Sequence, residues 1–275
     1  MRARRSSRAN VTFAAHTLPF IWQESPAKTI ESLAQRGFRQ IEFFGAPGYI
    51  DVWAPPAETT KILGPALKAA QCETIGIDIS THDYNLASLD SHVAEFTLKA
   101  YERLMDLASE LGIRNITVHG GRRIAFNAPP GNKQWDALRS SFDRLAIAAE
   151  RRSFEILIEN VAPSLINGAV AMERFANDGD WPNLFFVYDI ANAAAAGEDP
   201  AAGLLKVLPR VKAVHISDTE HGAIGSGSIE FAAIHNVLKD ADYKGHLVLE
   251  ICTPNSLDDL AAGAAALEAA GWGQS

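Results

Sequence analysis

The chain has 275 residues, of which 47% are hydrophobic and 21% are charged, as is ordinary for a globular protein with a large core. Its net charge of −8 at pH 7 argues against a nucleic-acid partner, because such a partner requires a basic surface. No apolar run approaches the length of a membrane span, so no membrane partner is expected either.

The beginning of the chain carries its basic cluster, Arg2, Arg4, Arg5 and Arg8. We interpret residues 1–10 as a disordered or frayed N-terminus and residues 11–275 as a single domain. The apolar run 11–20 is interrupted by a histidine and a proline, so it lacks the core of a signal peptide.

The two cysteines, Cys72 and Cys252, are expected to be buried free thiols in a reducing compartment. Together with the absence of a signal-peptide pattern, they favour a cytoplasmic protein.

Strand-like and helix-like segments alternate along the chain. The expected strands are 11–15, 40–44, 74–80, 115–118, 156–159, 184–188, 211–216 and 247–251. The expected helices are 27–36, 58–71, 90–111, 135–152, 169–175, 201–208, 231–238 and 257–270. Strict alternation predicts a parallel sheet, and eight such units predict a single (β/α)8 TIM barrel. The alternative is an open doubly wound sheet, but the Gly-rich phosphate loop after its first strand is missing.

Polar residues end the last four predicted strands: Glu159, Asp189, His215 and Glu250. In a parallel barrel these ends share one rim, and neighbouring strands are ~4.8 Å apart, so the four side chains can converge on one ion. Three carboxylates and one imidazole suit Mn, Mg, Zn, Co or Fe(II), whereas a closed structural zinc site would use thiolates. A single such residue would more often be a solvated rim residue, but one on each of four strands predicts a divalent metal site.

Three histidines, His16, His82 and His119, follow the first, third and fourth predicted strands. Each is a candidate for binding a substrate hydroxyl or carrying a proton; the alternative is a histidine hydrogen-bonded to a neighbouring loop. Glu42, in the second strand, is expected to orient His16 or His82; the alternative is a buried salt link at the rim.

Two polar residues stand beside the expected metal ligands. Asn160 follows Glu159, and Asp218 follows the strand of His215. We expect both to aim the ligands by hydrogen bonds rather than to bind the metal.

Several short motifs resemble one known family. They are Asn85-Leu-Ala-Ser-Leu-Asp90, Val118-His119-Gly-Gly121, Ile158-Glu159-Asn160, Tyr188-Asp189, Val214-His215-Ile-Ser-Asp218, Gly225-Ser-Gly227 and Leu249-Glu250. The chain resembles the xylose-isomerase-like TIM-barrel superfamily, which includes ketose 3-epimerases, hydroxypyruvate isomerases, inosose dehydratases and endonuclease IV. The resemblance implies that Glu159, Asp189, His215 and Glu250 bind one divalent metal ion, with Mn favoured.

The chain departs from this pattern at two positions. Asn192 stands where many relatives have a histidine, and His221 stands where ketose 3-epimerases have an arginine. Both residues are expected to bind substrate hydroxyls through hydrogen bonds without a fixed cation, which argues against a free ketohexose as the substrate. Endonuclease IV has an Asp-x-His pair where this chain has Thr219-Glu-His221, so DNA repair is not expected.

An apolar wall for the pocket is expected from the loop 126–133, flanked by Phe126 and Trp135. Trp22 is expected either to shield the mouth of the site or to pack under a loop.

These residues favour a metal-dependent isomerase or epimerase that acts on a sugar, keto-sugar or polyol derivative by proton transfer through an enediolate. Glu159 and Glu250 would be the base and the acid. Two alternatives stay open: a lyase, either a dehydratase or an enzyme that cleaves 3-oxo-glycosides with His119 or His221 as acid, and a non-catalytic sugar-binding barrel. The expected partner is a small carbohydrate-like molecule, and a homo-oligomer is compatible with the sequence.

Overall fold

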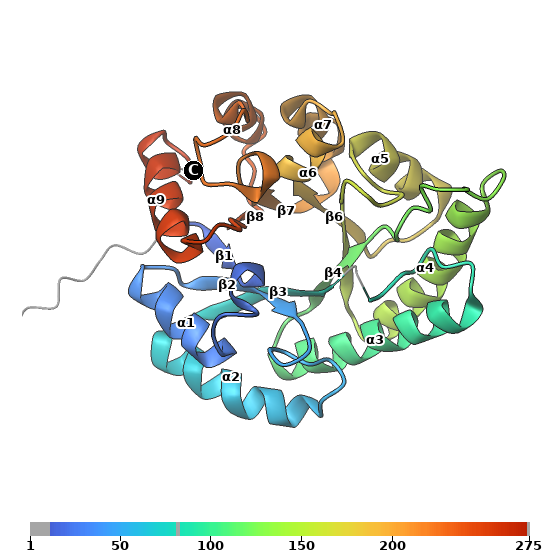
Figure 1. Cartoon of the computed structure of the whole chain (residues 1–275), viewed down its shortest axis with the longest axis horizontal. Coiled ribbons are helices and arrows are strands. Elements are labelled where there is room, and N and C mark those ends of the chain that lie inside the picture. Colours follow the sequence, from blue (N-terminus) through green and yellow to red (C-terminus); the bar gives the residue numbers. More distant parts are fainter. Residues whose placement is uncertain (1–11, 81–82, 274–275) are drawn as a thin grey trace, which may run out of the picture.

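The computed structural model describes residues 12–80 and 83–273. In these residues eight parallel strands form one sheet, hydrogen-bonded in the order β3-β2-β1-β8-β7-β6-β5-β4. This is the cyclic order of a barrel, interrupted between β3 and β4, and helices surround the strands in chain order (Figure 1). The predicted (β/α)8 barrel is confirmed.

The strands are β1 (Ala14–His16), β2 (Gln40–Gly45), β3 (Glu73–Ile79), β4 (Asn115–His119), β5 (Glu155–Glu159), β6 (Leu184–Asp189), β7 (Val211–Ile216) and β8 (His246–Leu249). The helices are α1 (Pro26–Gln35), α2 (Pro56–Ala70), α3 (Ser91–Glu110), α4 (Lys133–Arg151), α5 (Ala169–Asp178), α6 (Ile190–Ala195), α7 (Pro200–Val207), α8 (Phe231–Asp240) and α9 (Ser256–Ala269). Three 3-10 turns are Leu18–Phe20, Leu208–Arg210 and Thr219–His221.

The barrel is nearly closed at the junction of β3 and β4. No main-chain ladder joins these two strands within the described residues. Instead, the side-chain amide of Asn115 on β4 donates a hydrogen bond of 3.0 Å to the carbonyl oxygen of Ile75 on β3. A side chain therefore replaces one main-chain contact at this junction.

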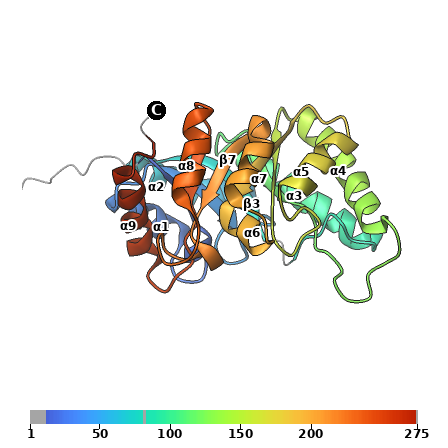
Figure 2. The same cartoon turned by 90° about the horizontal axis from the view of Figure 1, so that it is seen from above.

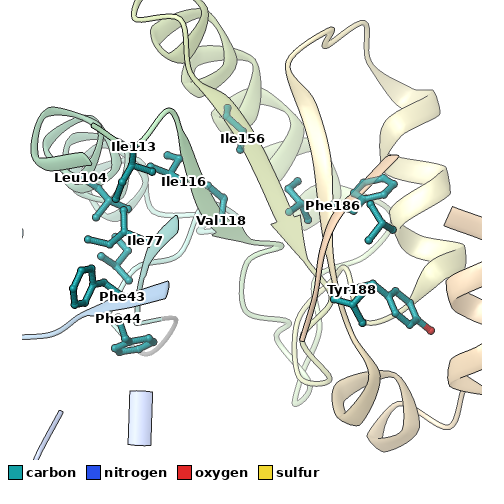
Figure 3. Close-up of a cluster of buried hydrophobic side chains, with 14 of the residues drawn as sticks. Phe43, Phe44, Ile77, Leu104, Ile113, Ile116, Val118, Ile156, Phe186 and Tyr188 are labelled. Carbon is teal, nitrogen blue, oxygen red and sulfur yellow. The ribbon is translucent and has the colours of Figure 1, made fainter. Parts of the chain in front are cut away.

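Most of the core lies between the sheet and the ring of helices. Figure 3 shows part of this layer, where Ile77 and Ile116 on neighbouring strands pack near Leu104 of α3. All three side chains are fully buried. Burial of this kind contributes about 25 cal/mol per Å² of apolar surface, so it holds the strands of the barrel in place.

The interior of the barrel holds a second, much smaller apolar cluster, which we call the interior plug. Its members are Ala14, Leu157, Val187, Ala213 and Val248, one each from β1, β5, β6, β7 and β8. The plug therefore forms an apolar floor for the side chains that lie nearer the carboxyl ends of these five strands.

The short helix α6 was not predicted. It begins directly after β6, and the side chain of Asp189 caps it by accepting a hydrogen bond of 2.6 Å from the backbone N–H of Asn192. A helix of six residues shows no periodicity in the sequence. Its place on the rim, inside the outer ring of helices, is visible in Figure 1.

Several smaller expectations can be compared with the structure. β1 begins at Ala14 rather than at Val11, which lies outside the described residues together with the expected frayed segment 1–10. Both cysteines are free, as expected, but Cys72 is only half-buried and Cys252 is exposed. Among the described helices, none has the length and apolar character that a membrane crossing requires.

Candidate active site and metal centre

The candidate site lies directly above the interior plug, because side chains on the same face of a β-strand recur every two residues. Inward-facing side chains alternate along a strand, so the residue two positions after each plug residue also points into the barrel. Those five residues are His16, Glu159, Asp189, His215 and Glu250. The strands thus place a polar layer directly above an apolar floor, at the carboxyl ends where TIM barrels carry their function.

Four of these residues form the predicted metal cluster. Glu159, Asp189, His215 and Glu250 each offer one ligand atom, and the four atoms lie within 4.8 Å of one another. All four residues are at least 96% buried, since their exposed fractions range from 0 to 4%. The sequence prediction that four strand ends converge is therefore matched by the geometry.

The donor atoms in this cluster suit a cation. His215 Nδ1 lies 2.9 Å from Glu250 Oε2, yet neither atom is in hydrogen-bonding geometry, and the buried Asp189 Oδ2 also has no hydrogen-bond partner. Buried polar atoms without partners are unfavourable, so atoms of this kind facing one point indicate a ligand that binds them together. A hard oxygen-rich set with one imidazole is suited to a divalent ion such as Mn.

Glu42 holds His215 from the opposite side of the ring. Glu42 Oε2 lies 3.0 Å from His215 Nε2, and the hydroxyl of Thr117 donates to Glu42 Oε1 at 3.1 Å. The expectation that Glu42 orients His16 is therefore wrong, whereas the alternative of a buried salt link is confirmed, with His215 as the partner. The reason is that Glu42 does not reach the pocket above the cluster but lines a cavity toward the amino ends of the strands, where its carboxylate meets the His215 ring. Because Nε2 faces a carboxylate, Nδ1 is left to face the metal cluster.

A second group of potential ligands adjoins the first. Asp78, His119 and Glu159 bring their ligand atoms within 4.8 Å of one another, and His119 Nε2 lies 3.0 Å from Glu159 Oε2. Sequence reasoning missed Asp78, although it stands two residues before the end of the predicted third strand. Its flanking residues Ile77 and Ile79 face the helices, which was the available signal that Asp78 faces the interior.

His16 connects the two groups. Its Nε2 lies 3.3 Å from Asp78 Oδ1 and its Nδ1 lies 3.4 Å from Glu250 Oε1. Only 1% of His16 is exposed, and it is not among the residues that line the pocket. The expected substrate contact through His16 is therefore not supported, because the side chain lies beneath the pocket and contacts carboxylates instead.

The charges in the cluster shift the pKa values of its members. Burial disfavours the charged form of His215, but Glu42 and Glu159 raise the pKa of this histidine well above its usual value. Burial also acts against ionisation of Glu159, yet His215 and His119 lower its pKa to about 2. For Asp189 burial dominates and raises the pKa to about 6. In the metal-free protein the histidines therefore hold the protons that compensate the carboxylates.

Asn160 positions Asp189 through its backbone. The Asn160 side chain donates to the carbonyl oxygen of Asp189 and accepts from its N–H, both at 2.8 Å. Asn160 is fully buried. These contacts agree with the expectation that Asn160 orients a neighbouring ligand residue, since its amide fixes the backbone of Asp189 at the end of β6.

Asp218 acts on a loop rather than on His215. Its carboxylate accepts hydrogen bonds from the backbone N–H groups of Thr219, Gly225 and Ile229. These bonds order the loop that carries His221, which has a left-handed backbone with φ of 56°. The expectation that Asp218 aims a metal ligand is therefore corrected: it fixes the loop beside the site.

A pocket of about 410 Å³ opens above the cluster. Of the expected substrate contacts, His119, Asn192 and His221 line it, as do the two glutamates proposed as catalytic, Glu159 and Glu250. His221 Nε2 also lies 3.6 Å from Asp189 Oδ2. The remaining expected contact, His82, lies outside the described residues.

The apolar wall of the pocket comes from a different part of the chain than expected. Phe126 is 93% exposed and does not line the pocket, while Trp135 is buried against α5 and donates to Asp178. The loop between β4 and α4 extends away from the barrel, as the green segment at the lower right of Figure 2 shows. The wall is formed instead by the segments after β1 and β2, including Trp22, which is not packed under a loop.

Comparisons with known proteins agree with this architecture. The family model of the xylose isomerase-like TIM barrel matches residues 30–274. L-ribulose 3-epimerase of Mesorhizobium japonicum is 24% identical over 253 residues, which cover 87% of this chain and 82% of that protein.

Two solved structures share the fold. A D-tagatose 3-epimerase-like protein aligns with a TM-score of 0.82 at 22% identity, over 94% of this chain and 96% of its own. The 3-keto-D-glucoside 4-epimerase of E. coli aligns with a TM-score of 0.79 at 18% identity, over 94% and 100%. The expected family resemblance is confirmed, and the chain belongs to the xylose isomerase-like TIM-barrel family.

Proposed function

We propose that this protein is a metal-dependent isomerase or epimerase that acts on a sugar, keto-sugar or polyol derivative. The observation that carries the proposal is the convergence of Glu159, Asp189, His215 and Glu250 at the bottom of an open pocket. The similarity to L-ribulose 3-epimerase and to other sugar epimerases supports the same class of substrate.

Glu159 and Glu250 are suited to move protons at the carbon next to a carbonyl group. Both line the pocket, and neighbouring histidines lower the pKa of both carboxyls against the effect of burial, so both can accept a proton. His119 lies 3.0 Å from Glu159, and His16 lies 3.4 Å from Glu250. The raised pKa of each of these imidazoles keeps it protonated, so each proposed base has a proton donor beside it.

The four clustered residues would hold a divalent ion, which supplies the positive charge that stabilises an enediolate. The protein's own part is to bind the ion, to orient the substrate through Asn192 and His221, and to place a carboxylate beside the reacting carbon. Mn is the favoured ion, with Mg, Zn, Co or Fe as alternatives.

Exchange of substrate hydrogen with solvent tests this function. Metal-loaded protein would be incubated in D2O with ketoses, inososes and 3-oxo-glycosides, and deuterium incorporation followed by NMR. Glu250→Gln should lower the rate on the reactive substrate by roughly 100-fold or more. Glu150→Gln, which changes an exposed carboxylate on α4, should leave the rate unchanged. A Glu250→Gln protein that keeps its metal and its full turnover would refute the assignment.

A lyase is the second candidate, and the position of His221 supports it. His221 lines the pocket on the ordered loop after β7, where its imidazole can donate a proton to a departing group. Mass spectrometry of the products separates the two functions, because a lyase releases water or an aglycone whereas an isomerase conserves mass.

A further inference from the structure

The pocket has two chemically different sides. All the apolar residues that line it except Val161 come from the segment after β1 or from the end of β2 and the segment after it, namely Leu18, Ile21, Trp22, Phe44, Ala46 and Pro47. The other lining residues come from β3 and later parts of the chain. Apart from Val161, all of them are polar or charged. A ligand that fills this pocket therefore meets the metal cluster on one side and an apolar surface on the other.

Trp22 is the most exposed large hydrophobic residue of this surface. Its side chain is 78% exposed although the segment that carries it is held firmly. Phe20 is buried, and its carbonyl oxygen accepts hydrogen bonds from the N–H groups of Gln23 and Glu24 at 2.9 and 3.1 Å. The indole is thus a large flat surface on an anchored turn, which a ligand in the pocket would remove from water.

The lysine- and arginine-free lining of the pocket, as far as the structure describes it, is rich in carboxylates, and its two histidines, His119 and His221, each lie beside a carboxylate of the cluster. Four carboxylates line it, those of Asp78, Asp83, Glu159 and Glu250, whereas no lysine or arginine does so within the described part of the chain. A phosphate or carboxylate group on a ligand would therefore meet these carboxylates away from the metal cluster, without a lysine or arginine of the described lining to bind it.

The volume also exceeds what a small sugar alone requires. At about 410 Å³ the pocket falls in the range of ~300–1,000 Å³ that is typical for drug-sized ligands. Such a pocket has room for a sugar ring above the cluster and for a second group against the indole of Trp22.

We propose that the substrate is an uncharged polyhydroxy ketone that carries an apolar, planar substituent, such as an aryl 3-oxo-glycoside. This proposal rests on the proposed function, since it places the keto-sugar part at the metal cluster. The substituent then packs on Trp22 and the neighbouring apolar residues, and phosphorylated sugars are excluded.

Binding measurements test the substrate class apart from turnover. The probes are phenyl and methyl β-glucosides and the 6-phosphate of the methyl compound, titrated into Mn-loaded protein by calorimetry. The phenyl compound should bind roughly tenfold more tightly than the methyl compound, because only the phenyl ring covers the indole. The phosphate should bind at least ~10-fold more weakly than the methyl compound.

Two variants assign the effect to the pocket wall. Trp22→Ala should remove the difference between the phenyl and methyl compounds, while Trp22→Phe should retain most of it. Phe126→Ala, which removes an exposed aromatic ring outside the pocket, should leave it unchanged. Equal binding of the two compounds by the native protein, an undiminished difference in Trp22→Ala, or tighter binding of the phosphate would each overturn the proposal.

Turnover distinguishes failure of the substrate class from failure of the function. If phenyl and methyl 3-oxo-glucosides both exchange hydrogen with solvent at equal kcat/KM, the substrate class is wrong and the function stands. If the phenyl preference appears in binding but neither compound exchanges hydrogen or loses its aglycone, the substrate class stands and the proposed function fails.

Discussion

Glu42 Oε2 lies 3.0 Å from His215 Nε2, although β2 and β7 are not adjacent in the sheet and the two residues are 173 positions apart. The contact therefore crosses the interior of the barrel. It directs His215 Nδ1 toward the carboxylates of the cluster, so Glu42 orients a proposed metal ligand without being one itself.

Replacing Glu42 should weaken metal binding. Glu42→Ala removes the acceptor for His215 Nε2, so the affinity for Mn should fall by about 10–100-fold, as is usual when such an outer partner is lost. Glu42→Gln keeps a hydrogen-bond acceptor without the charge, so the affinity of this variant for Mn should fall less. Calorimetric titration measures both, with Glu150→Gln as the exposed control. Native affinity in Glu42→Ala would show that His215 is oriented without Glu42.

Metal binding should release protons and weaken at low pH. In the metal-free protein the pKa of His215 is raised above its usual value and burial raises the pKa of Asp189 to about 6. Both groups must lose their protons to act as ligands, so binding at pH 7 should release a proton from His215 and affinity should fall further below pH 6. Titrations in two buffers of different ionisation enthalpy measure the release. A buffer-independent heat and a constant affinity between pH 5 and 7 would contradict this expectation.

Asn160 should contribute to stability as well as to the site. Asn160→Ala leaves the buried N–H and carbonyl groups of Asp189 without their partners, which costs about 1–3 kcal/mol of unfolding free energy. Urea denaturation of the metal-free protein measures the loss. Asn132→Ala, at an exposed residue without a capping hydrogen bond, is the control and should stay near the native value. Equal stability of the two variants would mean that water satisfies Asp189 in place of Asn160.

Free ketohexoses should be poor substrates. Asn192 and His221 line the pocket, and neither supplies the fixed cation that an arginine would. Mn-loaded protein should therefore turn over fructose, tagatose or psicose at least ~10-fold more slowly than a larger, less polar polyol derivative, because only the latter covers the apolar wall. Chromatography of the products measures both rates. Efficient epimerisation of a free ketohexose would refute this prediction and leave the metal site untouched.

The barrel and the four clustered residues were predictable from local pattern alone. Each strand is a short β-branched or apolar run with a polar residue at its end, and parallel pairing carries all such ends to one rim. Glu159, Asp189, His215 and Glu250 could therefore be placed together without coordinates, because the geometry of a parallel barrel is independent of the side chains in its loops.

Which side chains contact these four residues could be learned only from the tertiary structure. Whether Glu42 meets His16 or His215 is decided by its depth in the barrel, and the contact crosses strands that are distant in the chain. Asp78 was overlooked because it lies within a predicted strand rather than at its end, although the apolar residues on either side of it indicate that it faces the interior. The wall of the pocket was misassigned to Phe126 because the direction in which a loop leaves the rim depends on packing far from that loop. The two-residue repeat of a strand tells which side chains face the barrel interior. The depth of a side chain in the barrel, the register between strands and the direction of a loop are set only when the whole sheet closes.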